Sequence, residues 1–232
     1  SGCGKSTLLK HLFGLYVPLS GRVWIEGDEV TAASGPALRR ILRRVGVTFQ
    51  NGAMFGSMTV TENVRLPLEE FTDLPGEAMD LIARMKLRLV GLDGYGGYMP
   101  SELSGGMLKR AALARAMVMD PRVLFLDEPS AGLDPITSAG LDQLILRLAA
   151  SLKITFVIVS HELPSIFAVA DRVIMLDRAA RGIVAAGRPD ELRERSDNPR
   201  VRQFFNRLAD ENNGNGSSPA RPESVGGEGS HA

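Results

Sequence analysis

Short apolar runs alternate with segments of helical spacing along most of the chain. Four runs are β-branched or leucine-rich and are bounded by Gly, Pro or polar residues, which predicts buried strands at 45–49, 123–126, 155–159 and 172–176. Apolar residues recur at intervals of three and four over 141–152, after the start signal Asp134-Pro135, which predicts an amphipathic helix. Strands alternating with helices predict an open α/β fold with a mostly parallel core sheet formed by the four runs.

Three other segments depart from this alternation. Residues 60–100 contain no buried strand run, and 77–90 have helical spacing, so we predict a mainly helical insertion there. Residues 22–25, followed by the turn Glu26-Gly27-Asp28, predict a small antiparallel hairpin. From Asp210 onward Asn, Gly, Ser, Pro and Glu dominate, and such a composition cannot offset the entropy of ordering. We therefore predict a disordered tail.

Charge and cysteine content exclude several classes of protein. The 232 residues include 27 Lys and Arg against 27 Asp and Glu, so no net positive field would hold nucleic acid. The single cysteine, Cys3, rules out an internal disulfide and a zinc cluster of cysteines. No stretch approaches the roughly 20 apolar residues of a membrane-spanning helix. We expect a cytoplasmic chain with no nucleic-acid partner.

The first residues have the pattern of a phosphate-binding loop that leads into a helix. In such a loop backbone N–H groups converge on phosphate oxygens, Lys5 reaches the β and γ phosphates, and Ser6 ligates Mg²⁺. The pattern G-x-x-x-x-G-K-[ST] places Ser1 at its third position, so the leading glycine is absent. Taken alone, this segment is equally typical of a phosphate-binding loop and of an ordinary glycine turn before a helix. The predicted phosphate-binding residues are Ser1, Gly2, Cys3, Gly4, Lys5, Ser6 and Thr7.

Two acidic residues follow the apolar run 123–126. A buried strand that ends in Asp127 can place its carboxylate beside Mg²⁺, and Glu128 can orient and deprotonate an attacking water. Taken alone, this pattern is more typical of a core strand followed by a loop that contains acidic residues. Together with the Gly-Lys-Ser-Thr segment far upstream, it favours a nucleoside triphosphatase.

A second anion site is predicted at Leu103-Ser104-Gly105-Gly106-Met107, where a serine and two glycines begin another helix. At this point the sequence resembles the ATP-binding subunits of ABC transporters, whose signature motif is L-S-G-G-Q, with Met107 in place of glutamine. Further positions match in the family's order: Gln50 the Q-loop glutamine, 130–134 the D-loop, and His161 the switch histidine.

The resemblance covers residues 1–208 and implies the fold and assembly of that family. It implies a P-loop NTPase cassette with a small antiparallel β part and a helical subdomain at about 60–118, leaving 209–232 as the tail. The family's cassette has strands before its phosphate loop, so we expect this chain to be truncated inside that motif. The family binds ATP and Mg²⁺ in a head-to-tail homodimer, in which Ser104, Gly105 and Gly106 would serve the partner subunit's ATP.

The same resemblance implies roles for single residues. Glu128, His161 and Gln50 would be catalytic, with His161 on the γ-phosphate, and Ser6, Gln50 and Asp127 would hold the metal. Gln50 would also couple the Mg²⁺ site to a transmembrane permease subunit. As a separate physical hypothesis, residues 50–68 form the groove that receives a short cytoplasmic helix of the permease, with Met54, Phe55 and Met58 as its apolar lining.

Several segments resemble one branch of the family, the Mla/Mce-type ATPases, which drive phospholipid or other lipid movement across the bacterial envelope. They are Met107 and residues 49–55, 59–68, 134–138 and 198–205. This resemblance implies an Mce-domain lipid-binding protein as a further partner, and a peripheral location on the inner face of the plasma membrane. The alternatives are an ABC ATPase for another cargo (amino acid, metal chelate or lipoprotein), a soluble ABC ATPase without a permease, and a module that binds nucleotide without hydrolysing it.

Overall fold

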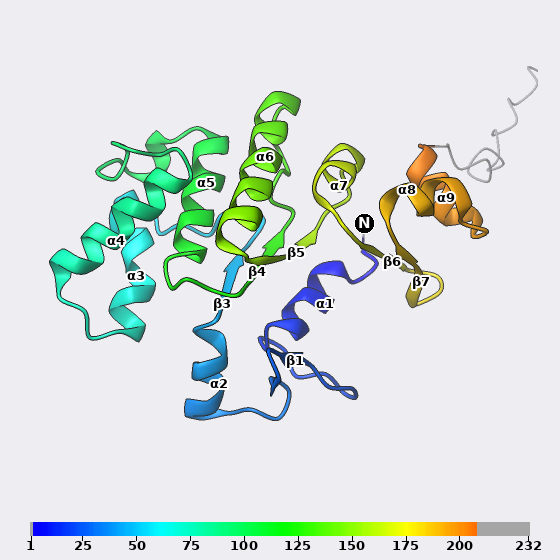
Figure 1. The fold of residues 1–232 in the computed structure, drawn as a ribbon, viewed down its shortest axis with the longest axis horizontal. Coiled ribbons are helices and arrows are strands. Elements are labelled where there is room, and N and C mark those ends of the chain that lie inside the picture. Colours follow the sequence, from blue (N-terminus) through cyan, green and yellow to red (C-terminus); the bar gives the residue numbers. More distant parts are fainter. Residues whose placement is uncertain (1, 208–232) are drawn as a thin grey trace, which may run out of the picture.

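The computed structural model describes residues 2–207, and a three-stranded parallel sheet lies at its centre. The strands β3 (Val45–Thr48), β4 (Val123–Asp127) and β5 (Thr155–Val159) lie in that order, with Val45 beside Val123 and Val123 beside Thr155. In Figure 1, α5 and α6 cover one side of this sheet and α1 lies on the other. The predicted α/β fold with a parallel sheet is confirmed, and the three carboxyl ends form one edge.

The fourth predicted strand is present, but its assignment to the core sheet is wrong. Within residues 2–207, β6 (Val173–Asp177) pairs only with β7 (Gly182–Gly187), and it does so antiparallel. A short turn joins the two strands, and Ile174 and Ile183 are more than half exposed. A hairpin can leave one face to solvent, unlike a strand of a covered parallel sheet. An apolar run by itself does not distinguish these two cases.

The predicted hairpin near the start is also present. β1 (Trp24–Ile25) pairs antiparallel with β2 (Asp28–Glu29) across Glu26 and Gly27. Both turn residues have positive φ, 50° and 85°, as a two-residue turn that matches the twist of its strands requires. The hairpin forms a separate two-stranded sheet.

Helices fill the intervals between the strands. The predicted helices at 77–90 and 141–152 correspond to α4 and to most of α6, and the interval 60–118 contains α3, α4, η1 and α5. The division of the chain into subdomains stays a prediction, and Ser1 and the tail 209–232 lie outside the described residues. The helices are α1 (Lys5–Leu12), α2 (Gly35–Leu42), α3 (Val60–Phe71), α4 (Gly76–Leu89), η1 (Pro100–Glu102), α5 (Gly105–Ala116), α6 (Pro135–Leu152), α7 (Leu163–Val169), α8 (Pro189–Arg195) and α9 (Pro199–Asn206).

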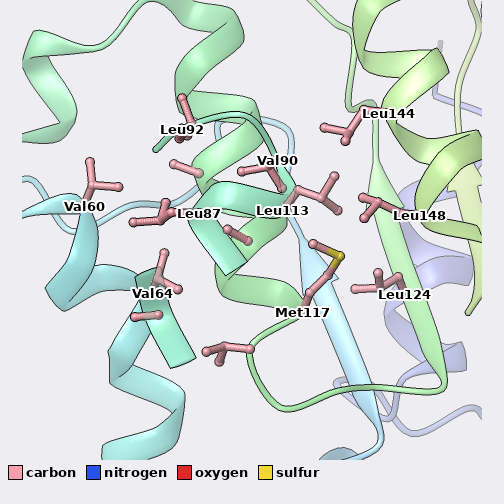
Figure 2. Close-up of a cluster of buried hydrophobic side chains, with 14 of the residues drawn as sticks. Val60, Val64, Leu87, Val90, Leu92, Leu113, Met117, Leu124, Leu144 and Leu148 are labelled. Carbon is pink, nitrogen blue, oxygen red and sulfur yellow. The ribbon is translucent and has the colours of Figure 1, made fainter. Parts of the chain in front are cut away.

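One large apolar cluster joins the helical segment to the sheet. Figure 2 shows this cluster extending from Val64 of α3 and Leu87 of α4, past Leu113 of α5, to Leu148 of α6 and Leu124 of β4. The next strand residue, Phe125, belongs to a second cluster with α1, so β4 is buried on both faces as predicted. The helices therefore share one core with the sheet, and α5 packs against its strands. None of the helices in residues 2–207 combines the length and hydropathy that crossing a bilayer requires.

The carboxyl end of α5 lies directly against β3, and a glycine makes this approach feasible. A Cβ on Gly46 would lie 2.1 Å from the carbonyl oxygen of Ala116 and 2.4 Å from Leu124 Cδ2. Both distances are far inside van der Waals contact, and one of the two atoms belongs to the backbone. Gly46 therefore sets the spacing between α5 and the sheet.

We predict that Gly46→Ala destabilises the protein by at least about 2 kcal/mol, because overpacking forces backbone shifts. Urea unfolding followed by circular dichroism measures the change. Gly97→Ala is the matched control, since a Cβ there meets no described atom within 4 Å. Equal unfolding midpoints for the two variants would show that the close approach of α5 to β3 is not a constraint.

Candidate functional site

The predicted phosphate loop and the end of β4 meet at the carboxyl edge of the parallel sheet. The hydroxyl of Ser6, in the first turn of α1, donates a hydrogen bond of 2.9 Å to Asp127 Oδ1 across 121 positions of sequence. Asp127 is the last residue of β4 and is buried. A hydroxyl and a carboxylate facing each other are oxygen ligands of the kind that Mg²⁺ prefers when phosphates supply the rest.

The loop before α1 presents backbone donors. Gly2 and Gly4 have φ of 78° and 92°, and a Cβ on either meets no described atom within 4 Å, so the left-handed conformation is what requires glycine. Gly4 is the N-cap of α1 and gives it no side-chain hydrogen bond. The first amides of α1 therefore face the loop uncapped, which favours an anion. Lys5 Nζ lies 3.9 Å from Cys3 Sγ, so its ammonium is turned back toward the loop.

The predicted base and the switch histidine form a pair. The Nδ1–H of His161 donates to the carboxylate of Glu128, whose oxygens lie 2.8 and 2.9 Å away. The Glu128 side chain is 11% exposed and that of His161 is 64% exposed. The carboxylate of Glu128 is therefore nearly buried, whereas the imidazole ring of His161 is accessible to solvent. Glu128 itself has φ of 49°, and its amide donates to the carbonyl of Val159 at the end of β5. A γ-phosphate contact of His161 stays a prediction, since here the ring is engaged with Glu128.

Gln50 lies at the same edge, two residues after β3, and is exposed. The ammonium of Lys109, from α5, contacts its carbonyl oxygen and also lies 3.5 Å from the carbonyl oxygen of Glu128. Sequence reasoning missed Lys109, because nothing in its spacing distinguishes it from a solvated lysine on a helix.

The second predicted anion site begins α5 and lies against α6. Ser104 caps the helix through its hydroxyl, which accepts from the amide of Met107 at 3.3 Å. A Cβ on Gly106 would lie 2.4 Å from Thr137 Cγ2, and one on Gly105 would lie 3.6 Å from Leu133 Cδ2. The first turn of α5 is thus packed against the residues that begin α6, while Ser104 and Gly105 themselves are exposed.

Buried polar groups join the helices that follow the D-loop and His161. Ser165 of α7 donates to Asp142 Oδ2 of α6 at 2.8 Å, and its oxygen lies 3.4 Å from Ser138 Oγ. Burial raises the pKa of Asp142, and the hydrogen bond from Ser165 partly opposes this. The contact holds α7, and with it the segment after His161, against α6.

A wide groove of about 1710 Å³ lies beside this contact, between α6, α7 and α9. Its lining includes His161 and Glu162 but none of residues 2–7. The groove is therefore separate from the predicted phosphate-binding residues 2–7, although His161 is part of its lining. The described residues also contain no cluster of three or more His, Cys, Asp or Glu side chains that would hold a metal alone. A Mg²⁺ bound through one carboxylate, one hydroxyl and substrate phosphates fits this donor set.

Comparison with known proteins shows that the chain is similar to ATP-binding proteins of ABC transporters. Residues 1–131 match the family described as ABC transporter. The chain is 43% identical over 210 residues to the intermembrane phospholipid transport system ATP-binding protein MlaF of Escherichia coli (strain K12), a match that covers 90% of this chain and 77% of that protein. It is 44% identical over 206 residues to the probable ribonucleotide transport ATP-binding protein mkl of Mycobacterium tuberculosis (strain ATCC 25618 / H37Rv), which covers 89% of this chain and 56% of that one.

Solved structures agree with these matches. The dimeric post-hydrolysis state of the ATP-binding cassette MJ0796 bound to ADP and Pi is similar with a TM-score of 0.72 and 29% identity, over 81% of each chain. The structure of cbiO1 from Clostridium perfringens, part of the ABC transporter complex cbiONQ, has a TM-score of 0.74 and 28% identity over 82% of this chain and 75% of that one.

The D-loop carboxylate gives a pH-dependent prediction. The side chain and amide of Thr137, with the amide of Ile136, hold the pKa of Asp134 below its ordinary value. A lowered folded-state pKa stabilises the protein above the unfolded pKa of about 3.9, and this stabilisation is lost as the pH falls through the lower folded value. We expect Asp134→Ala to lower the urea midpoint at pH 7, and the difference from wild type to shrink as the pH falls below 4.

Asp134→Asn is the control, because it keeps an acceptor oxygen that does not titrate. Its difference from Asp134→Ala should stay constant over the same pH range. A wild-type advantage that is equally large at pH 3 and pH 7 would mean that the charge of Asp134 does not contribute.

Proposed function

The chain belongs to the ABC transporter family, and from this premise we propose that it drives phospholipid or related lipid transport across a bacterial envelope. The membership confirms the resemblance that the motifs indicated: the chain is an ATP-binding, ATP-hydrolysing subunit of an ABC transporter. The observation that carries the lipid cargo is the likeness to MlaF, which spans nine-tenths of the chain. A second candidate cargo, a ribonucleotide, is favoured only by the likeness to mkl.

In this proposal, residues 2–7 hold the phosphates of ATP, with the uncapped amides of α1 and the ammonium of Lys5 as donors. Ser6, Asp127 and Gln50 would hold Mg²⁺, which neutralises phosphate charge as the terminal phosphoryl bond breaks. The hydrogen bond between Ser6 and Asp127 supports the assignment, because it already brings two of these ligands together.

Glu128 accepts the proton of the attacking water, and its buried position at the end of β4 suits a fixed base. The Nδ1–H of His161 orients the carboxylate, and its exposed ring leaves the other nitrogen available to the γ-phosphate. The pair therefore couples the position of the base to the presence of nucleotide.

The chain would act as a homodimer on the inner face of the plasma membrane, with a permease and an Mce-domain lipid-binding protein. Two anion sites on different helices support this, since a two-fold, head-to-tail dimer uses each of them twice. Ser104 and Gly105 are exposed, as a contact to the partner's ATP requires. The similar cassette MJ0796 is itself dimeric.

In this proposal, residues 50–68 form the groove that receives a permease helix, lined by Met54, Phe55 and Met58. Met54 is partly buried against the main apolar cluster, and Phe55 is 52% exposed. The buried side chain of Asn63 bonds both the amide and the carbonyl of Phe55, at 2.7 and 3.0 Å. This contact fixes the backbone from which the aromatic ring is presented, and Phe55 remains the proposed contact with the permease.

We predict that Glu128→Gln lowers steady-state ATP hydrolysis by at least about 100-fold, because a carboxamide cannot accept the proton from water. Phosphate release at saturating ATP and Mg²⁺ measures turnover, and retention of labelled ATP on a filter measures binding, which should be kept. Arg147→Gln, an exposed substitution on α6, is the control and should hydrolyse ATP like wild type. Turnover of Glu128→Gln near the wild-type rate would eliminate Glu128 as the base.

The cargo is tested with the complete transporter, reconstituted with its permease in vesicles. We expect ATP hydrolysis to rise severalfold when phospholipid is supplied, and fluorescent phospholipid to leave the vesicles only with ATP. Ribonucleotide in the vesicle lumen should have no effect. Stimulation by ribonucleotide and not by phospholipid would reverse the choice between the two cargoes.

A further inference from the structure

Two cationic side chains of α5 contact the backbone of the loop that follows β3. The ammonium of Lys109 contacts the carbonyl oxygen of Gln50. The guanidinium of Arg115 donates to the carbonyl oxygens of Gly52 and Ala53, at 2.9 and 2.8 Å. Three carbonyls within four residues are thus bonded to one helix. The loop also lies directly on α5, since a Cβ on Gly52 would be 3.5 Å from the Cβ of Ala112.

The conformation of this loop requires such support. Gly52 and Ala53 have φ of 72° and 48°, so both are left-handed. An alanine in this region costs on the order of 1–2 kcal/mol, and such a conformation persists where its surroundings hold it. The two hydrogen bonds of Arg115 go to the carbonyls of these same residues.

Lys109 lies deeper in the site than a solvated lysine would. Burial lowers its pKa, while the charges of Glu128 and Glu162 oppose that effect. A partly buried ammonium needs acceptors, and it finds them at the carbonyls of Gln50 and Glu128, on the neighbouring strand ends of β3 and β4. One cation therefore connects the backbones of two proposed catalytic residues.

The same helix begins at the signature residues. Lys109 lies one turn after Gly105, and the helix rises about 1.5 Å per residue, so the contact is about 6 Å along the axis from the second anion site. Helix, loop and strand ends are thereby joined by side-chain hydrogen bonds as well as by the apolar core.

We infer that Lys109 is a positioning residue that holds Gln50 and Glu128 in the geometry of hydrolysis, and that Arg115 fixes the loop after Gln50 for the same purpose. The inference rests on the proposed roles of Gln50 and Glu128. In addition to contacting the partner subunit's ATP, α5 would then align the hydrolytic residues of its own subunit.

The experiment compares Lys109→Gln, Lys109→Arg and Arg115→Gln with Arg110→Gln in the purified protein. Arg110 is the matched control, because it lies on the same helix and donates to a carbonyl, that of Val90, away from the site. For Lys109→Gln and Arg115→Gln we expect kcat to fall about 10- to 100-fold, as a misplacement near 1 Å does, with the KM for ATP within about threefold of wild type. Arginine also donates to carbonyls, so Lys109→Arg should recover most of kcat.

Amide hydrogen exchange without nucleotide provides a readout besides activity. Residues 50–55 should exchange faster in Lys109→Gln and Arg115→Gln, and at the wild-type rate in Arg110→Gln and Lys109→Arg. Thermal unfolding of each variant shows that the fold is kept.

Wild-type kcat and wild-type exchange in Lys109→Gln would overturn the inference. An equal loss of kcat in Arg110→Gln would also overturn it, since the effect would then be one of general stability. A wild-type protein that binds but does not hydrolyse ATP would instead refute the proposed function, and the exchange measurement would still decide whether Lys109 holds the loop.

Discussion

The parallel register of β3, β4 and β5 is the constraint on which the site depends. Thr48 lies beside Leu126, and Asp127 beside Val159, so the three strands end within one residue of one another. Gln50, Glu128 and His161 follow these ends within two residues and therefore lie along one edge. The uncapped start of α1 approaches the same edge, where Ser6 bonds Asp127. A ligand site at the carboxyl ends of parallel strands is the general rule for open α/β sheets.

Packing of the helices against the sheet fixes their positions relative to this edge. The helices α3 to α6 share one apolar cluster with β4, and the absence of a side chain on Gly46 lets α5 lie against β3. From the same helix, Lys109 and Arg115 contact carbonyl oxygens of the loop after β3. The signature residues at the other end of α5 are packed against α6 through Gly106 and Thr137. Both anion sites are thus fixed to the same sheet.

Much of this arrangement could be predicted from the sequence, because short motifs carry it. The Gly-Lys-Ser segment and the apolar run before Asp127 locate the two halves of the pair that Ser6 and Asp127 form. Other features depend on tertiary packing and could not be predicted. The apolar run of β6 pairs in a hairpin, Met54 packs against the main apolar cluster, and Lys109 of α5 contacts the carbonyls of Gln50 and Glu128. No local pattern encodes these three outcomes.

We propose that the signature end of α5 completes the partner subunit's ATP site, while the sheet edge of each subunit supplies the hydrolytic residues. Light scattering on the hydrolysis-deficient Glu128→Gln protein, with and without a further Ser104→Arg substitution, tests it most directly. We expect the mass of Glu128→Gln to double when ATP and Mg²⁺ are added, and the mass of the double variant to stay that of a monomer. A double variant that still dimerises with ATP, or a Glu128→Gln protein that stays monomeric, would contradict it.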